Sequence, residues 1–339
     1  MSKSSQAMQQ QQMSQQMKVG GKSSSGLSSK GFNIPMRTLG DGNSIPALGL
    51  GTLNMSSNEA FNCISMAFKS GYRLIDTSPV YGNEEAIGAA LEECLKSGLV
   101  KRDEIYVTSK LWITDRNSVK DAVKKSLKAL RLDYIDLYMI HYMTPDIVKD
   151  TLMIERVSTQ EVWRQMEHCK DEGLIRSIGV MNCPVVMFLE ILTFCETKPA
   201  LNCLEMHPYF TQDEALSFYK KLKIPVAAFS PLASHENLKT LDLLPESFKK
   251  LDLMSDTLIK DLAKKYGKSP SQIVLNWHMH HEQIFFPGMR EENHFLENGE
   301  IFNFDLSQDD LKKISGLNRN ARLFDRIQDD NYSYIPYWL

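Results

Sequence analysis

The chain has 339 residues, enough for one large domain or two ordinary ones, and its 42% hydrophobic and 24% charged content is typical of a soluble globular protein. The formal net charge of -3 gives no support for a nucleic-acid partner, and no apolar run reaches the length of a membrane span. Six scattered cysteines without a Cys-x-x-Cys pair, and a start that lacks a secretory signal, indicate reduced thiols in a cytoplasmic protein.

Residues 1–32 differ in composition from the rest of the chain. They are rich in Gln, Ser and Met and nearly without aliphatic side chains. Such a segment buries too little apolar surface to offset the entropy that it would lose on ordering. We therefore expect a disordered extension over residues 1–32 and one folded domain over residues 33–339.

The folded part is predicted to open with a β-hairpin. Strand-like residues 36–39 and 44–48 flank the turn Gly40-Asp41-Gly42-Asn43, and such residues suit the backbone of a tight turn.

Beyond the hairpin, short apolar runs alternate with helix-like segments. Strands are predicted at 48–51, 74–75, 104–109, 134–140, 175–180, 200–205, 225–229 and 283–286. Helices are predicted at 57–70, 84–97, 117–130, 159–172, from Pro184 onward, and at 212–222, 254–266, 270–279, 291–298 and 307–316. This alternation predicts an α/β fold, and eight such units fit a closed (β/α)8 TIM barrel. A Rossmann fold is disfavoured because Gly49 and Gly51 are followed by Asn54, where the dinucleotide fingerprint needs a third glycine.

Polar side chains stand at the carboxyl ends of the predicted strands. They are Asp76, with Tyr81 in the loop behind it, and then Lys110, His141, Asn182 and His207. In a (β/α)8 barrel these strand ends meet at one mouth, which is where such barrels carry their chemistry. We therefore expect the first four side chains of this set to form one site.

An Asp, a Lys, a Tyr and a His gathered in this way suit the reduction of a carbonyl group. Hydride delivered to the carbonyl carbon leaves charge on oxygen, which must then take up a proton. Tyr81 is assigned as the general acid, and a neighbouring ammonium, Lys110, lowers the phenol pKa from its reference value of about 10. Asp76 would hold that buried ammonium, and His141 would position the substrate oxygen.

The motifs around these residues, read together, resemble the aldo-keto reductase family from about residue 35 to the C-terminus. The matching stretches are 45–52, 71–88, 107–112, 134–141, 173–182, 207–209 and 229–232. The resemblance implies a (β/α)8 barrel that reduces aldehydes and ketones with NADPH, usually as a monomer. It also implies that Asp76, Tyr81, Lys110 and His141 are the catalytic set.

The resemblance implies further contacts around that set. Cofactor contacts are implied for Thr52, Asp76, Asn182, Phe229, Ser230, Leu232, Ser234, Glu297 and Asn298. Substrate contacts are implied for Leu53, Trp112, His141 and Tyr142. Two positions depart from the family pattern, because Met181 and Cys203 stand where a Ser and a Gln hold the nicotinamide carboxamide. Phe229 replaces the usual Tyr and keeps its stacking face.

The expected clamp for the 2′-phosphate of NADPH is also altered. Gly288, Met289 and His294 occupy the positions of a Lys, a Ser and an Arg in the family. Charge-assisted hydrogen bonds to an anion contribute up to a few kcal/mol each, so their loss removes much of the basis for preferring NADPH. NADPH is the cofactor expected from the family, and NADH is the alternative.

Other readings remain open at this point. The altered clamp is consistent with a weakly active or inactive barrel that has a structural or binding role. The segment His278-Met279-His280-His281-Glu282 contains metal-ligating residue types, but it closes a helix, where adjacent ligands seldom converge on one ion, so no metal is expected. The aromatic tail, residues 332–339, either closes over the pocket or packs on the barrel rim.

Overall fold

The computed structural model describes residues 32–144, 147–148, 153–154, 156–233, 248 and 250–324, with only the backbone described at 147–148 and 153–154. Residues 1–31 of the predicted disordered extension, Ser234 and the aromatic tail lie outside the described residues.

The predicted hairpin is confirmed. Its strands, β1 (Met36–Thr38) and β2 (Ser44–Pro46), pair antiparallel across a turn in which Gly42 has a φ of 88°. That left-handed backbone explains a glycine at this position. The amide of Gly40 donates to the Ala200 carbonyl at 2.7 Å, so the turn packs beneath the strands at the end opposite the barrel mouth.

Eight parallel strands follow in one sheet whose spatial order equals the chain order. They are β3 (Leu50–Gly51), β4 (Leu74–Asp76), β5 (Tyr106–Leu111), β6 (Ile135–Ile140), β9 (Ile175–Met181), β10 (Asn202–Glu205), β11 (Val226–Phe229) and β12 (Ile284–Phe285). A parallel bridge joins Leu48 to Phe285, and the Gly51 amide donates to the Pro287 carbonyl at 3.1 Å. These contacts join the last strand to the first, which confirms the predicted (β/α)8 barrel.

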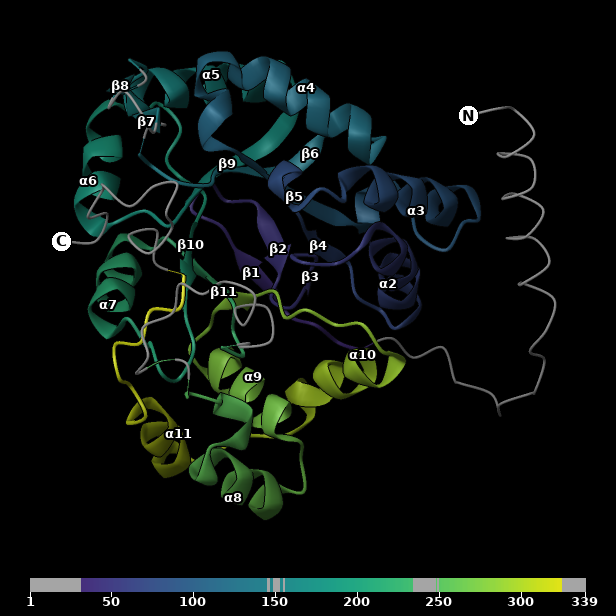
Figure 1. The fold of residues 1–339 in the computed structure, drawn as a ribbon, viewed down its shortest axis with the longest axis vertical. Coiled ribbons are helices and arrows are strands. Elements are labelled where there is room, and N and C mark those ends of the chain that lie inside the picture. The colour runs from purple at the N-terminus through teal and green to yellow at the C-terminus, as the bar shows by residue number, and fades with distance from the viewer. Residues whose placement is uncertain are drawn as a thin grey trace. The chain divides into compact units, whose positions relative to one another are not determined.

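Helices surround the strands, which lie at the centre of the fold (Figure 1). They are α2 (Ser57–Lys69), α3 (Glu84–Lys96), α4 (Val119–Leu130), α5 (Thr159–Asp171), α6 (Val185–Phe194), α7 (Asp213–Leu222), α8 (Thr257–Tyr266), α9 (Pro270–His280), α10 (Glu292–Gly299) and α11 (Gln308–Ser315). Each matches a predicted helix to within a few residues. In the described ranges, none of the helices combines the length and hydrophobicity needed to cross a bilayer.

Local signals explain several helix boundaries. Ser56 and Glu59 form a reciprocal capping box at the start of α2, and Ser269 and Gln272 form another at the start of α9. Each box satisfies two backbone amides that a helix N-terminus would otherwise leave without partners.

The core has an inner and an outer part. Side chains such as Leu74, Leu137, Met139 and Cys203 fill the barrel interior, and a larger apolar cluster lies between the strands and helices α2 to α7. The interior filling makes the barrel a packed scaffold, so its strand ends hold fixed positions at the mouth.

Two features were not predicted. Within the loop after β6, the backbone forms a short antiparallel pair, β7 (Ile147–Val148) with β8 (Met153–Ile154). Strands of two residues are too short to show a periodic pattern in sequence.

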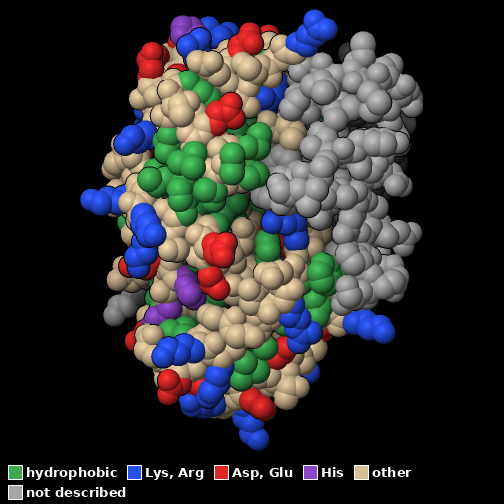
Figure 2. Space-filling model, turned by 90° about the vertical axis from the view of Figure 1, so that its left-hand side faces the viewer, with side chains coloured by type: hydrophobic (Ala, Val, Ile, Leu, Met, Phe, Trp, Pro, Cys, Tyr) green, Lys and Arg blue, Asp and Glu red, His purple; other side chains and the backbone are tan. Residues whose placement is uncertain are grey.

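The second feature is helix α6, which is apolar on its outer side as well. Val186 is 78% exposed, and apolar side chains gather on the face that carries α6 and α7 (Figure 2).

Candidate active site

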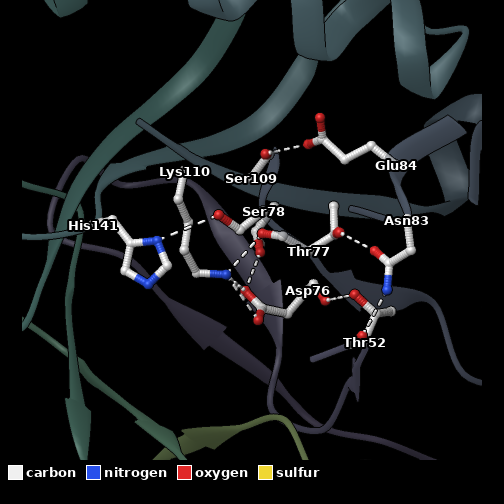
Figure 3. Close-up of polar contacts among 10 residues, drawn as sticks. Thr52, Asp76, Thr77, Ser78, Asn83, Glu84, Ser109, Lys110 and His141 are labelled. Atoms are coloured by element: carbon white, nitrogen blue, oxygen red, sulfur yellow. Dashed lines mark hydrogen bonds and ion pairs between the residues drawn. The ribbon is translucent and has the colours of Figure 1, made fainter. Parts of the chain in front are cut away.

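A buried ion pair lies at the mouth of the barrel. Lys110 Nζ is 2.9 and 3.0 Å from the two carboxylate oxygens of Asp76 and donates to the Thr77 carbonyl at 2.7 Å (Figure 3). The Thr108 hydroxyl donates to Asp76 Oδ1 at 2.6 Å. Lys110 therefore has its charge neutralised and its ammonium fixed in one position.

The strands explain this geometry. Asp76 ends β4 and pairs in register with Thr108 on β5. Thr108 and Lys110 are two residues apart, so both side chains point to the same side of β5 and reach Asp76. Burial has the largest single effect and lowers the pKa of Lys110. The charges of Asp76 and Tyr81 and the hydrogen bonds to Asp76 together outweigh burial and raise that pKa, so the ammonium stays protonated.

Tyr81 lies directly beside this ion pair. It ends a short 3₁₀ turn, Pro79–Tyr81, and Lys110 Nζ is 4.9 Å from its ring centroid. Burial raises the pKa of Tyr81 to about 12, while Lys110 acts in the opposite direction. The expected lowering by Lys110 is therefore present, but burial has the larger effect, so the net shift of the Tyr81 pKa is upward.

His141 follows β6 and completes the group. Its Nδ1 lies 3.3 Å from the Ser78 hydroxyl, and its ring is 6.2 Å from the Tyr81 ring in an edge-to-face arrangement. Trp112 contacts the histidine ring edge-on at 5.0 Å. The structure thus brings the four predicted catalytic side chains together.

A cavity of about 270 Å³ opens at this group. Asp76, Tyr81 and His141 line it together with mainly apolar and aromatic side chains. Of the predicted substrate contacts, Leu53, Trp112, His141 and Tyr142 all line the cavity. A larger hollow of about 370 Å³ lies near the hairpin, remote from the catalytic group.

The predicted cofactor contacts near the catalytic group divide into two groups. Phe229, Ser230 and Leu232 line the cavity, as does Gly288. Thr52 and Asn182 are buried behind it: the Thr52 hydroxyl donates to the Asp76 carbonyl at 2.9 Å, and the Asn182 amide donates to the His141 carbonyl at 3.2 Å. These two side chains hold the backbone of catalytic residues.

The remaining predicted contacts lie on α10, away from the cavity lining. Asn298 is buried, and Glu297 and His294 are exposed. Ser234 lies outside the described residues.

Several side chains at the site were missed from sequence. Ser109, the residue before Lys110 on β5, donates to the buried Glu84 carboxylate at 2.6 Å, and burial raises the pKa of Glu84. Ser78 was also missed, although its position in the loop directly after Asp76 indicates that it lies at the barrel mouth. Phe324 lines the cavity and packs edge-to-face on Phe229 at 5.5 Å. Phe324 lies far along the chain from the strand ends that form the site, so no local sequence pattern places it there.

Glu205 holds Phe324 in place. Its carboxylate accepts hydrogen bonds from the amides of Leu323 at 2.7 Å and Phe324 at 3.0 Å, and it lies 3.0 Å from His207 Nε2. His207 was predicted at the mouth from its strand-end position, but it is fully buried against Glu205 and does not line the cavity.

We expect Glu205→Ala to lower the free energy of unfolding by about 3 kcal/mol, because it leaves backbone amides without their charged acceptor. It should also weaken substrate binding by releasing Phe324. Glu205→Gln keeps one acceptor oxygen and should lose less stability. Urea unfolding of the three proteins measures the effect, and equal stability of all three would contradict it.

The histidine-rich end of α9 does not converge on one point. His278 Nε2 lies 3.0 Å from the Pro231 carbonyl in the interior, His280 Nε2 lies 3.5 Å from Asp305, and the His281 ring packs against Trp277. Each ring has a separate protein partner.

The fold and the site define a class: a (β/α)8 barrel enzyme with a phenol, a buried ammonium–carboxylate pair and an imidazole at one apolar cavity. A model of the Aldo/keto reductase family matches residues 47–319, most of the chain. The chain belongs to the aldo-keto reductase family.

Three proteins similar to this chain are named as reductases. Aldose reductase C of Dictyostelium discoideum is 36% identical over 309 residues, covering 86% of this chain and 92% of that protein. Glyoxal reductase of Bacillus subtilis is 36% identical, covering 84% and 93%. Aldo-keto reductase family 1 member C2 of Homo sapiens is 35% identical, covering 84% and 91%.

The predicted activity is confirmed at the level of the family. The protein is an oxidoreductase that reduces carbonyl groups of small molecules with a nicotinamide cofactor.

Proposed function

We propose that the chain reduces small, uncharged aldehydes or ketones with NADPH, and that Tyr81 donates the proton. One observation carries this proposal: Tyr81 and His141 lie at one cavity beside the buried Lys110–Asp76 pair. Burying an ammonium is costly, so its presence beside a phenol indicates that its charge has a use.

Each residue has a distinct task. The bound nicotinamide nucleotide supplies the hydride that reaches the carbonyl carbon. Tyr81 gives its proton to the developing alkoxide, and the Lys110 ammonium stabilises the phenolate that remains. Asp76 keeps Lys110 in position. The His141 ring lies edge-to-face against the Tyr81 ring, with 6.2 Å between the ring centroids, and it orients the carbonyl oxygen toward Tyr81.

The cavity wall supports an uncharged substrate. Apolar or aromatic side chains dominate it, including Leu53, Val80, Trp112, Tyr142 and Phe324. Among the described lining residues there is no Lys or Arg, so a phosphate or carboxylate on the substrate would enter without a partner. We expect an uncharged aromatic aldehyde such as benzaldehyde to react faster than a sugar phosphate.

The residues present fit a nicotinamide nucleotide. The Phe229 ring lines the cavity and offers a face for the nicotinamide, as expected from sequence. Gly288 also lines it and leaves its backbone open to close approach, because a Cβ there would meet no atom closer than 3.9 Å. NADPH is proposed as the preferred cofactor. Because Gly288, Met289 and His294 replace a Lys, Ser and Arg clamp, the difference in affinity between NADPH and NADH should be smaller than that clamp would give.

Titration with NADPH and NADH, followed by quenching of tryptophan fluorescence, tests this assignment. We expect both cofactors to bind. Binding should quench the fluorescence, because Trp112 lines the cavity that the cofactor would enter. NADPH should bind more tightly. If neither cofactor bound at millimolar concentration, the reductase assignment would be wrong.

A monomer in the cytoplasm is proposed as the working form. The monomer follows from the resemblance to the family, whose members usually act as monomers. All six cysteines are free, which is typical of proteins in reducing compartments. Sedimentation velocity of the purified protein checks the monomer.

A further inference from the structure

The segment after β12 contains Arg290, a cation that the sequence pattern alone did not mark as a site residue. We propose that Arg290 binds a phosphate group of the nucleotide cofactor and replaces the lysine that the family pattern expects at position 288. This inference rests on the proposed use of a nicotinamide nucleotide.

The guanidinium of Arg290 lies next to the backbone where that lysine would stand. A methyl group added to Gly288 would lie 3.9 Å from Arg290 Nη1 and 3.9 Å from the Gly51 carbonyl oxygen. Both Gly51 and Gly288 line the catalytic cavity. The Arg290 side chain itself lines a surface hollow on α2, and its Nη1 atom lies close to the cavity lining at Gly288.

Two contacts hold the guanidinium in this place. Nη2 donates to the Asn54 carbonyl at 3.1 Å, and Nε lies 3.3 Å from Glu59 Oε1. The other oxygen of Glu59 accepts from Ser56 in the capping box of α2, so the carboxylate is itself fixed. Among the contacts of the described residues, Nη1 has no hydrogen-bond partner. It is the nitrogen nearest Gly288, and a guanidinium held in this way is prepared to bind an anion.

The residues at the other two clamp positions do not offer the same contact. Met289 is fully buried in the apolar core and has no polar atom to donate. His294 is exposed on α10, one turn after Glu291 and Glu292. Those acids reduce the local positive potential, so a phosphate depends on the guanidinium of Arg290.

Two phosphate sources share this chemistry: the 2′-phosphate, which only NADPH has, and the pyrophosphate, which NADPH and NADH both have. The register of Gly288 with the expected 2′-phosphate clamp favours the first. Comparison of the two cofactors separates the sources.

The test is calorimetric titration of the Arg290→Met protein with NADPH and with NADH. Removing one charge-assisted contact should weaken NADPH binding by about 10- to 100-fold. Unchanged NADH binding assigns the contact to the 2′-phosphate, and equal weakening of both assigns it to the pyrophosphate. Unchanged binding of both would overturn the proposal.

Two further variants sharpen the test. Lys69→Ala removes an exposed cation from the same surface hollow on α2 and should leave both affinities unchanged. Gly288→Lys added to Arg290→Met should restore NADPH binding, because a side chain at Gly288 meets no atom closer than 3.9 Å. Failure of the unmodified protein to bind either cofactor would instead count against the proposed function, so the two failures are distinguishable.

Discussion

Tyr81→Phe is expected to reduce the rate of carbonyl reduction by about 10²- to 10⁴-fold, because it removes the proposed general acid and changes little else. The ring stays beside Lys110, so NADPH binding should stay close to that of the unmodified protein. The measurement is the steady-state oxidation of NADPH with benzaldehyde, together with fluorescence titration of the cofactor. A variant that binds NADPH and retains full activity would show that the proton comes from another group.

The pH dependence follows from the raised pKa of Tyr81. A phenol with a pKa of about 12 is protonated throughout the neutral range. The acid needed for reduction is present below that pKa and is lost only as the pH rises toward it. We therefore expect the contribution of Tyr81 to the reduction rate to be flat from about pH 6 to 9. Oxidation of an alcohol needs the phenolate and should accelerate with rising pH.

Lys110→Met is the second change with a large expected effect. It removes a buried ammonium and leaves the Asp76 carboxylate with the Thr108 hydroxyl as its remaining side-chain partner among the described contacts. Breaking one half of a buried ion pair costs roughly 3–5 kcal/mol of folding stability. The same change removes the charge that stabilises the Tyr81 phenolate. Urea unfolding and the NADPH oxidation assay should both report large losses.

A double variant separates these two effects. Asp76→Asn added to Lys110→Met removes the uncompensated carboxylate, so much of the stability should return while activity stays low. If activity returned together with stability, Lys110 would have only a structural role. If the single Lys110→Met change left stability intact, the ion pair would not contribute as proposed.

Much of this fold was predictable because its signals are local. The predicted helices and barrel strands are each set by a run of apolar residues or by a cap such as Ser56 with Glu59. The order of chain and sheet is the same, so neighbours along the chain are neighbours in space. For that reason Asp76, Lys110 and His141, which come from adjacent strands, could be placed at one mouth from sequence alone.

The rest depends on contacts that join distant parts of the chain. Phe324 reaches the cavity through its backbone hydrogen bond to Glu205, 119 residues away, and neither residue carries a local sign of this. The net direction of the Tyr81 pKa depends on how deeply the ring is buried. The position of Arg290 beside Gly288 depends on the anchoring contacts with Asn54 and Glu59.

The altered phosphate clamp left a weakly active or inactive barrel as an alternative from sequence. The assembled group of Tyr81, Lys110, Asp76 and His141 at an open cavity argues against it, since a purely structural barrel gains nothing from a buried ammonium. Relatives named as reductases support the same conclusion.

Rapid mixing of the NADPH-loaded protein with excess benzaldehyde tests the central claim most directly. The account predicts loss of NADPH absorbance in a single turnover, with one equivalent of benzyl alcohol formed for each cofactor oxidised. The Tyr81→Phe protein, loaded with NADPH to the same extent, should carry out this turnover at least about 100-fold more slowly. Equal rates in the two proteins, or no turnover in either despite bound NADPH and a range of uncharged aldehydes and ketones, would contradict it.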